Sequence, residues 1–365
     1  MTNTNRQQGF IALTITFIIL LLVISLSIMT GKVLVGEQRI AANEMRYREA
    51  LANAEANLEA GMALIASGGV SAIPSLPTVV SAAQSTIPVG LRNMPMLNFT
   101  ATGSSIDGSA GQATVRVQAV IMPTVVGTPD SPLMLAAGMA VGGNFMVVAN
   151  PNGGGPGVPL SIWTKEHVEL TTGSGTTCGQ QEWANGTCSS SPYSEPGRVE
   201  SDILDDDATF PSDLLQYVFG VKDDAAGMLT LEQRAKALLT NCDTLTAASS
   251  GFYIVDGTCS PKGAVGSRTK PVVLLIRNGD LAMGANTQVF GIVFSYDSHP
   301  EVAPTYDLKM SGGATVWGSL IANHEVGNAN GTYNAVYDAE ALSNIQNNNQ
   351  DFVSLYKVPG SWRDW

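Results

Sequence analysis

Hydrophobic residues are concentrated at the start of the chain. From Phe10 to Met29 no position carries a charge, and fourteen of the positions are Leu, Ile, Val or Phe. A helix of this length crosses a bilayer, and the fourteen apolar residues contribute about −6 kcal/mol to insertion. No A-x-A-like cleavage site follows the run, as a secretory signal would require. Residues 10–29 are therefore predicted to form a transmembrane helix.

A second helical pattern runs from Lys32 to Ala66. Its apolar residues recur every three, four or seven positions, which places them on one face of a helix. We call this face the docking stripe: Ile40, Tyr47, Leu51, Ala54, Leu58, Met62 and Ile65. One continuous helix over 10–66 would be about 85 Å long. Gly31 and Gly36 weaken it between the two halves, each by about 1 kcal/mol relative to Ala.

The region from 67 to 130 is predicted to contain a linker and a small sheet. Residues 67–92 are rich in Ser, Ala, Pro and Gly, which favours a loop. Val115, Val117, Ala119 and Ile121 then alternate with other residues, the period of a half-buried strand. We expect this sheet to pack on the docking stripe.

The remainder, 131–365, is predicted to be a β-rich head that contains an internal repeat. The pattern of 280–294 recurs in 307–321 with a constant offset, so that Asp307 takes the place of Asp280 and Ile321 that of Phe294. Such a repeat indicates one strand unit stacked on its copy, as in a β-solenoid or a Greek-key-like ladder. It forms either an exposed binding platform or only core. Between 150 and 270 we expect a loop-rich insertion, with a short helix over 229–239. The fold class is thus α+β.

All four cysteines lie in that insertion. Three pairings are possible, and we expect two local disulfides, Cys178 with Cys188 and Cys242 with Cys259, because both close short loops. No C-x-x-C spacing of a zinc or redox site is present. Disulfides agree with a location outside the inner membrane.

Charge is distributed unevenly along the chain. Of 19 basic and 31 acidic residues, five of each lie in 1–65, which leaves 14 basic and 26 acidic residues for the rest. An acidic head repels phosphate groups, so nucleic-acid binding is not expected. Small cations are the ligands that such a head favours.

The densest acidic cluster comprises Asp202, Asp205, Asp206 and Asp207. Carboxylate oxygens suit Ca²⁺, although the spacing matches no EF-hand, and a solvated acidic loop is the alternative interpretation. No other cofactor is expected. The three histidines form no metal-ligand pair, and neither G-x-S-x-G nor a Walker loop occurs, so no catalytic site is predicted.

The chain ends with Trp362 and Trp365 in its last four residues. Large aromatic rings at a terminus favour docking. They either close the head's own sheet or bind a partner.

The N-terminus resembles that of a prepilin. Arg6-Gln7-Gln8-Gly9-Phe10 is similar to a prepilin peptidase site, which implies a leader over 1–9, a cut after Gly9 and methylation of Phe10. Gly31 lies where many pilins carry a helix-weakening residue. The sequences of residues 37–43 (EQRIAAN) and 47–50 (YREA) are similar to the corresponding region of PilX-type minor pilins of type IV pili.

Thr14 departs from the pattern of most pilins, which have Glu at the fifth residue after the cut. That Glu meets the free amine of the next subunit. Its absence resembles PilX-type pilins and the tip pseudopilin of type II secretion, and it implies a place at a filament tip. Neutral variation in a single-pass anchor is the alternative.

The resemblance implies a minor pilin that primes assembly and displays its head at the pilus tip. It would first span the inner membrane once, with the head in the periplasm. Partners would be the prepilin peptidase, the assembly platform, the major pilin, other minor pilins and a tip adhesin. Assembly would depend on Thr14, Gly31, Tyr47, Leu51 and Leu58. The alternatives are a tip pseudopilin of type II secretion and a surface adhesin or glycan-binding module.

Overall fold

The structure is a computed structural model. It describes residues 4–89, 92–107, 111–137, 139–140, 145–169, 175–188, 190–300, 306–326, 333–346 and 350–364. The chain forms two compact units. Unit 1 comprises 1–65, 70–120 and 356–365, and unit 2 comprises 66–69 and 121–355.

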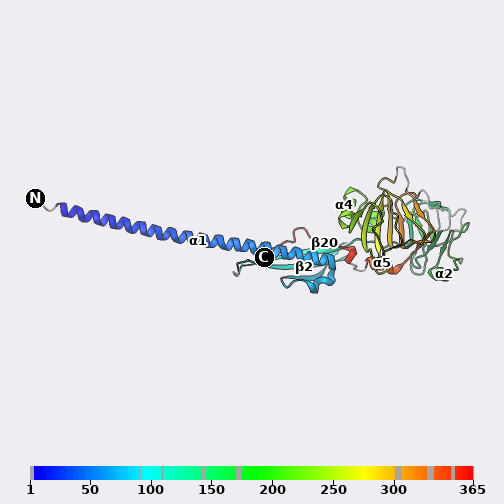
Figure 1. Cartoon of the computed structure of the whole chain (residues 1–365), viewed down its shortest axis with the longest axis horizontal. Coiled ribbons are helices and arrows are strands. Elements are labelled where there is room, and N and C mark those ends of the chain that lie inside the picture. The colour runs from blue at the N-terminus through cyan, green and yellow to red at the C-terminus, as the bar shows by residue number, and fades with distance from the viewer. Residues whose placement is uncertain are drawn as a thin grey trace. The chain divides into compact units, whose positions relative to one another are not determined.

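Unit 1 is built on the helix α1 (Thr4–Gly68), which is continuous, as predicted (Figure 1). It passes through Gly31 and Gly36 without interruption. A Cβ added at either glycine would meet no other atom within 4 Å, so nothing packs on the helix there.

A sheet in the order β1-β2-β3-β20 completes unit 1. Its elements are η1 (Val70–Ser75), β1 (Val80–Val89), β2 (Arg92–Ser104), β3 (Gln112–Pro123) and β20 (Val353–Lys357). The predicted strand is confirmed as β3, with Val115, Val117, Ala119 and Ile121 buried. The loop predicted over 67–92 is wrong for 80–89, because those residues pair antiparallel with β2 along their whole length. Composition alone does not reveal such pairing.

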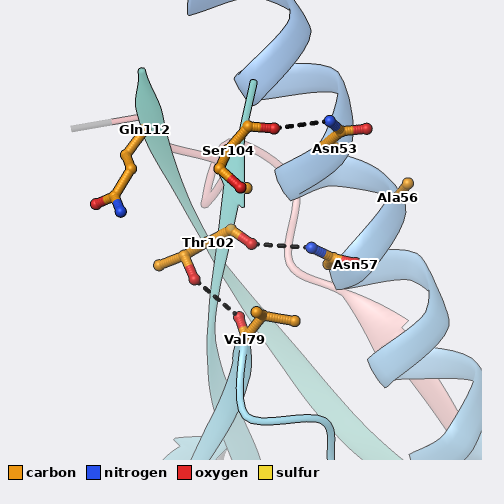
Figure 2. A pocket seen from close by; sticks show the side chains of 8 residues that line it. Asn53, Ala56, Asn57, Val79, Thr102, Ser104 and Gln112 are labelled. Carbon is orange, nitrogen blue, oxygen red and sulfur yellow. Dashed lines mark hydrogen bonds between the residues drawn. The ribbon is translucent and has the colours of Figure 1, made fainter. Parts of the chain in front are cut away.

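The last turns of α1 pack on this sheet. Ala50, Ala54, Leu58, Met62 and Ile65 are buried at helical spacing. Contact is closest at Gly103 of β2, where an added Cβ would lie 2.2 Å from the Ala54 nitrogen. Two asparagines of α1 also donate to β2 carbonyls, Asn53 to Ser104 and Asn57 to Thr102 (Figure 2). Only a residue without a side chain fits so close to the helix backbone.

Unit 2 is a stack of short parallel strands with a few helices. The strands are β4 (Leu133–Leu135), β5 (Met139–Ala140), β6 (Phe145–Val148), β7 (Ile162–Thr164), β8 (Val168–Glu169), β9 (Thr176–Cys178), β10 (Ile203–Leu204), β11 (Ala237–Leu239), β12 (Gly251–Asp256), β13 (Ala264–Val265), β14 (Val272–Arg277), β15 (Leu281–Met283), β16 (Gln288–Tyr296), β17 (Leu308–Met310), β18 (Ala314–Ala322) and β19 (Tyr333–Val336). The helices are α2 (Gln180–Asn185), α3 (Leu214–Phe219), α4 (Ala225–Arg234), α5 (Ala339–Gln346) and η2 (Gln350–Phe352).

The main sheet of unit 2 has the order β10-β7-β4-β18-β16-β14-β12-β11. Every described pair of strands within unit 2 is parallel, and smaller pairs such as β15–β17 and β5–β8 form further sides of the same coils. The chain therefore winds as a β-solenoid. Its order is permuted: β4, the first strand, pairs with β18 from near the end of the chain.

The two copies of the repeat lie on consecutive coils. Gln288 pairs with Thr315 and Leu281 with Leu308, and both pairs join positions that correspond in the two copies. The predicted stacking of the copies is confirmed, and the solenoid rather than the Greek-key arrangement is the one formed.

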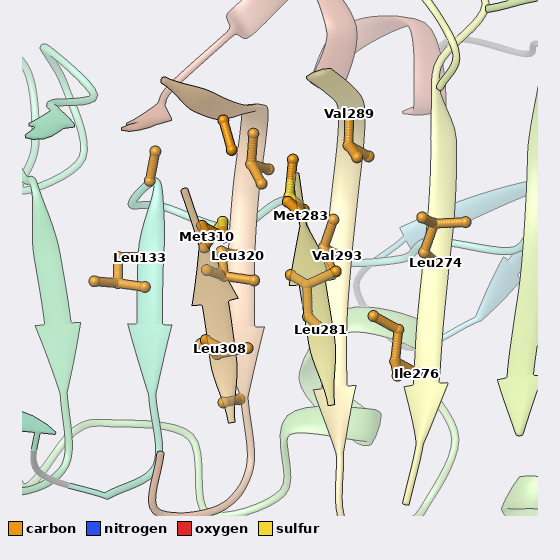
Figure 3. Close-up of a cluster of buried hydrophobic side chains, with 14 of the residues drawn as sticks. Leu133, Leu274, Ile276, Leu281, Met283, Val289, Val293, Leu308, Met310 and Leu320 are labelled. Carbon is orange, nitrogen blue, oxygen red and sulfur yellow. The ribbon is translucent and has the colours of Figure 1, made fainter. Parts of the chain in front are cut away.

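Both faces of the main sheet are buried. On one face its side chains meet those of β15 and β17 in a single cluster that includes Leu274, Leu281, Met310 and Leu320 (Figure 3). On the other face, side chains of α3, α4 and α5 cover it. Burial on two faces explains the uninterrupted apolar run of β14.

Residues 150–270 were expected to form a loop-rich insertion, and this prediction is wrong because much of the segment forms strands of the solenoid. Residues 150–270 supply β7, β10, β11 and β12 to the same sheet as the repeat. The helix predicted over 229–239 is α4, which begins at Ala225 and ends at Arg234; 237–239 form β11. Strands as short as these carry too little periodicity to be recognised in sequence.

Candidate functional site

The first half of α1 exposes its apolar side chains. Phe10 is 72% exposed, and large hydrophobic residues stay exposed as far as Val35. This part of the helix is long and apolar enough to cross a membrane. Gly9 lies within the helix, directly before Phe10. An apolar surface of this extent requires lipid or other helices to cover it.

Four hydroxyl groups in this half, those of Thr14, Thr16, Ser27 and Thr30, donate to carbonyls of the helix itself. Thr14 donates its Oγ1 hydrogen to the Phe10 carbonyl at 2.8 Å, and Ser27 and Thr30 donate to carbonyls one turn earlier in the same way. Thr14 is neutral and already bonded, so it offers no charge to a neighbouring chain. Such internal bonding lowers the cost of placing hydroxyls in hydrocarbon.

The docking stripe divides into two parts. Leu58 is 2% exposed and belongs to the core of unit 1, while Leu51 is half-buried. Ile40 is 68% exposed, and Tyr47, also exposed, donates its hydroxyl to Asp364 at 3.3 Å. The stripe from Leu51 onward thus packs on the chain's own sheet. The two residues of the stripe that lie before it, Ile40 and Tyr47, remain exposed.

The C-terminal tail pairs with β3. Arg116 and Arg363 exchange backbone hydrogen bonds of 2.8 and 3.0 Å. Trp362 is 44% exposed, and Trp365 lies outside the described residues. The tail backbone therefore extends the sheet of unit 1, while the ring of Trp362 stays accessible.

Two of the four clustered aspartates are engaged inside unit 2. Asp202 is fully buried and accepts 2.6 Å hydrogen bonds from the hydroxyls of Ser161 and Ser194. Burial raises the pKa of Asp202, against the opposing effect of these hydrogen bonds. Asp207 accepts from the Trp163 indole at 2.7 Å and from Thr209, whose hydrogen bonds lower the pKa of Asp207.

The other two aspartates converge on a histidine. Asp205 Oδ2 lies 2.7 Å from His167 Nδ1, and Asp206 Oδ2 lies 3.7 Å from the same atom. The four aspartates therefore do not surround one point, and the structure adds His167 to two of them. No sequence signal indicated this, because His167 and Asp205 belong to distant segments that come close only through the pairing of β7 with β10.

Both predicted disulfides are present. Cys178 bonds Cys188 with the Cα atoms 5.1 Å apart, and Cys242 bonds Cys259 with the Cα atoms 5.0 Å apart. The first closes the segment that contains α2. The second joins residues beyond β11 and β12, and both of its cysteines lie in the solenoid core.

The N-terminal residues match a known family. The family described as PilX N-terminal matches residues 8–59. This N-terminal region is of the PilX type. The match covers the implied cleavage position, the exposed half of α1 and part of the docking stripe. A PilX-type helix suits a membrane-anchored pilin, and it favours a structural role over an enzymatic one.

Neither the curated proteins nor the solved structures give a match to the chain. The PilX-type region ends before the sheet of unit 1, so the match does not extend to the solenoid.

Proposed function

We propose that the chain is a minor pilin, which is cut between Gly9 and Phe10 and incorporated into a type IV pilus. The observation that carries the proposal is the exposed apolar half of α1 within the PilX-type region. Once a subunit leaves the bilayer, this surface must be covered by the helices of neighbouring subunits. Those neighbours are the major pilin and other minor pilins.

A place at the filament tip is supported by Thr14. Its hydroxyl is bonded to its own helix, so it offers no negative charge to the amine of a following chain. A subunit at the tip has no neighbour above that needs this charge. Unit 2 is also much larger than the sheet of unit 1, and one copy at a tip avoids repeating it along a shaft.

The same proposal covers the state of the chain in the membrane before assembly and the exposure of unit 2 at the cell surface after it. Before assembly the chain spans the inner membrane once, with the sheet of unit 1 and unit 2 in the periplasm and Gly9 at the opposite, cytoplasmic end of the span. Prepilin peptidase and the assembly platform act on the chain while it is held in this membrane. After assembly unit 2 is displayed at the cell surface. Disulfides suit that environment.

Assembly is tested with Ile40→Glu. Ile40 is exposed on α1 beyond the apolar run, so a charge there should leave folding and processing intact but oppose burial between subunits. We expect the shortened product in the membrane and at least about a tenfold loss from sheared pili, equivalent to roughly 1.4 kcal/mol. Immunoblots of both fractions measure this.

Asn43→Glu is the matched control, because Asn43 is also exposed on α1 and is already polar. It should enter pili as the unaltered chain does. Equal incorporation of Ile40→Glu would contradict the assembly role. Immunogold labelling of sheared pili then tests the position: labels at ends support the tip, and labels spaced along the filament refute it.

A further inference from the structure

The turns after β7 and β10 bring three metal-ligating groups together at the surface of unit 2. These strands pair in parallel, with Ile162 opposite Ile203, so the turns that follow them are stacked. His167 comes from one turn, and Asp205 and Asp206 from the other. One nitrogen and two carboxylate oxygens lie within 4.8 Å of one another.

The spacing of these atoms is close to that of ligands around one ion. Donors bound to zinc at about 2 Å are roughly 3 to 3.5 Å apart, and the distances from His167 Nδ1 are 2.7 and 3.7 Å. The side chains of His167 and Asp206 are 67% and 69% exposed, so they are free to make the small adjustment. Asp205 is held more firmly, because it also accepts from the Val168 backbone.

The carboxylates of the site have no basic ion-pair partner in the described part of the chain. Among the residues that the structure describes, no lysine or arginine forms an ion pair with Asp205 or Asp206. By contrast, Asp280 and Asp307, also stacked on consecutive coils, share Lys309. Two adjacent carboxylates beside an imidazole nitrogen favour a divalent cation.

The donor set selects the class of ion. Ca²⁺ prefers six to eight oxygen ligands, and here Asp202 and Asp207 direct their oxygens into other hydrogen bonds. One imidazole with two carboxylates suits zinc and similar first-row metals. We propose that His167, Asp205 and Asp206 bind one divalent transition-metal ion of the zinc class, with water completing its coordination. His167 would coordinate through Nδ1, with its proton on Nε2.

The site is independent of the proposed pilus function and is tested by metal binding alone. Full-length protein in detergent, purified without a histidine tag and stripped of metal, is titrated with ZnCl₂ and separately with CaCl₂ by isothermal calorimetry. We expect one zinc per chain and weaker calcium binding. His167→Ala and Asp206→Asn should each lower zinc affinity by about 100-fold, at least as much as losing a supporting residue does.

Two variants serve as controls. His299→Ala removes another exposed histidine, and Asp207→Asn removes the adjacent carboxylate that bonds Trp163 and Thr209. Both should keep zinc affinity within about twofold of the unaltered chain, a difference of roughly 0.4 kcal/mol. The proposal is overturned if the chain binds no zinc, if His167→Ala binds it unchanged, or if calcium binds more tightly.

Discussion

Gly291 and Gly318 occupy the same place on consecutive coils of the solenoid. Both have positive φ, 130° and 141°, and they face each other in the pairing of β16 with β18. A Cβ on Gly318 would lie 2.0 Å from the Gly291 carbonyl oxygen. The repeat therefore preserves glycine here because the conformation and the space both require it.

Gly318→Ala should destabilise unit 2 by about 3 kcal/mol or more, since it combines an unfavourable φ with a backbone clash. Urea unfolding followed by tryptophan fluorescence measures the change. Gly284→Ala is the control: its nearest neighbour would be 3.8 Å away, so its stability should change little. Equal effects of the two variants would show that the clash is absent.

At the scale of elements, apolar residues at one helical spacing lie in two different environments along α1. Its buried residues from Ala50 onward hold the sheet of unit 1, whereas Ile40 stays exposed. A charge at Leu58, which the sequence alone suggested as an assembly residue, would disrupt the fold of the subunit itself. A test of the proposed contacts between subunits therefore needs a residue before Ala50, such as Ile40, whose change leaves the core of unit 1 intact.

The disulfide between Cys242 and Cys259 fastens the two strands at one end of the solenoid. Both cysteines are fully buried beside β11 and β12, with a sequence separation of 17. The double variant Cys242→Ala, Cys259→Ala should have a free energy of unfolding that is lower by roughly 3 kcal/mol, mainly because the unfolded chain gains conformational entropy without the cross-link. A quadruple variant that replaces all four cysteines by Ala measures the contribution of the other bridge, between Cys178 and Cys188. If that bridge contributes nothing to stability, the double and the quadruple variant should have the same urea midpoint.

At the scale of the whole molecule, the permuted order of unit 2 joins distant parts of the sequence. Leu320 of β18 pairs with Leu133 of β4 on one side and with Val293 of β16 on the other. Segments near the beginning and the end of this unit therefore share one core. We expect them to unfold together.

Leu320→Ala tests this coupling. Leu320 is fully buried, so the cavity left by the smaller side chain should lower the free energy of unfolding by about 2 to 5 kcal/mol. Hydrogen exchange should accelerate in 133–135 as much as in 292–294. Leu238→Ala, at an exposed position on the end strand β11, should leave both segments unchanged. Acceleration confined to 292–294 would mean that β4 is not part of the same cooperative unit.

The elements with a strong local pattern were predictable. The helix, strand β3 and the internal repeat each have a regular spacing of apolar residues, or a recurring segment, that can be recognised along the chain itself. Strands β7 and β10 are very short and exist only because each pairs with a neighbouring coil. The convergence of His167 with Asp205 was missed for the same reason.

The sequence by itself determined the apolar helix, the prepilin-like N-terminus, the disulfide pairs and the existence of a repeat. These follow from composition, spacing and chain-local geometry. Tertiary structure alone decided that Leu58 belongs to the subunit's own core, that 150–270 continues the solenoid, and that only two of four aspartates meet a histidine. Such outcomes depend on which backbone segments pair, and pairing between distant segments leaves no periodic trace in the residues that take part.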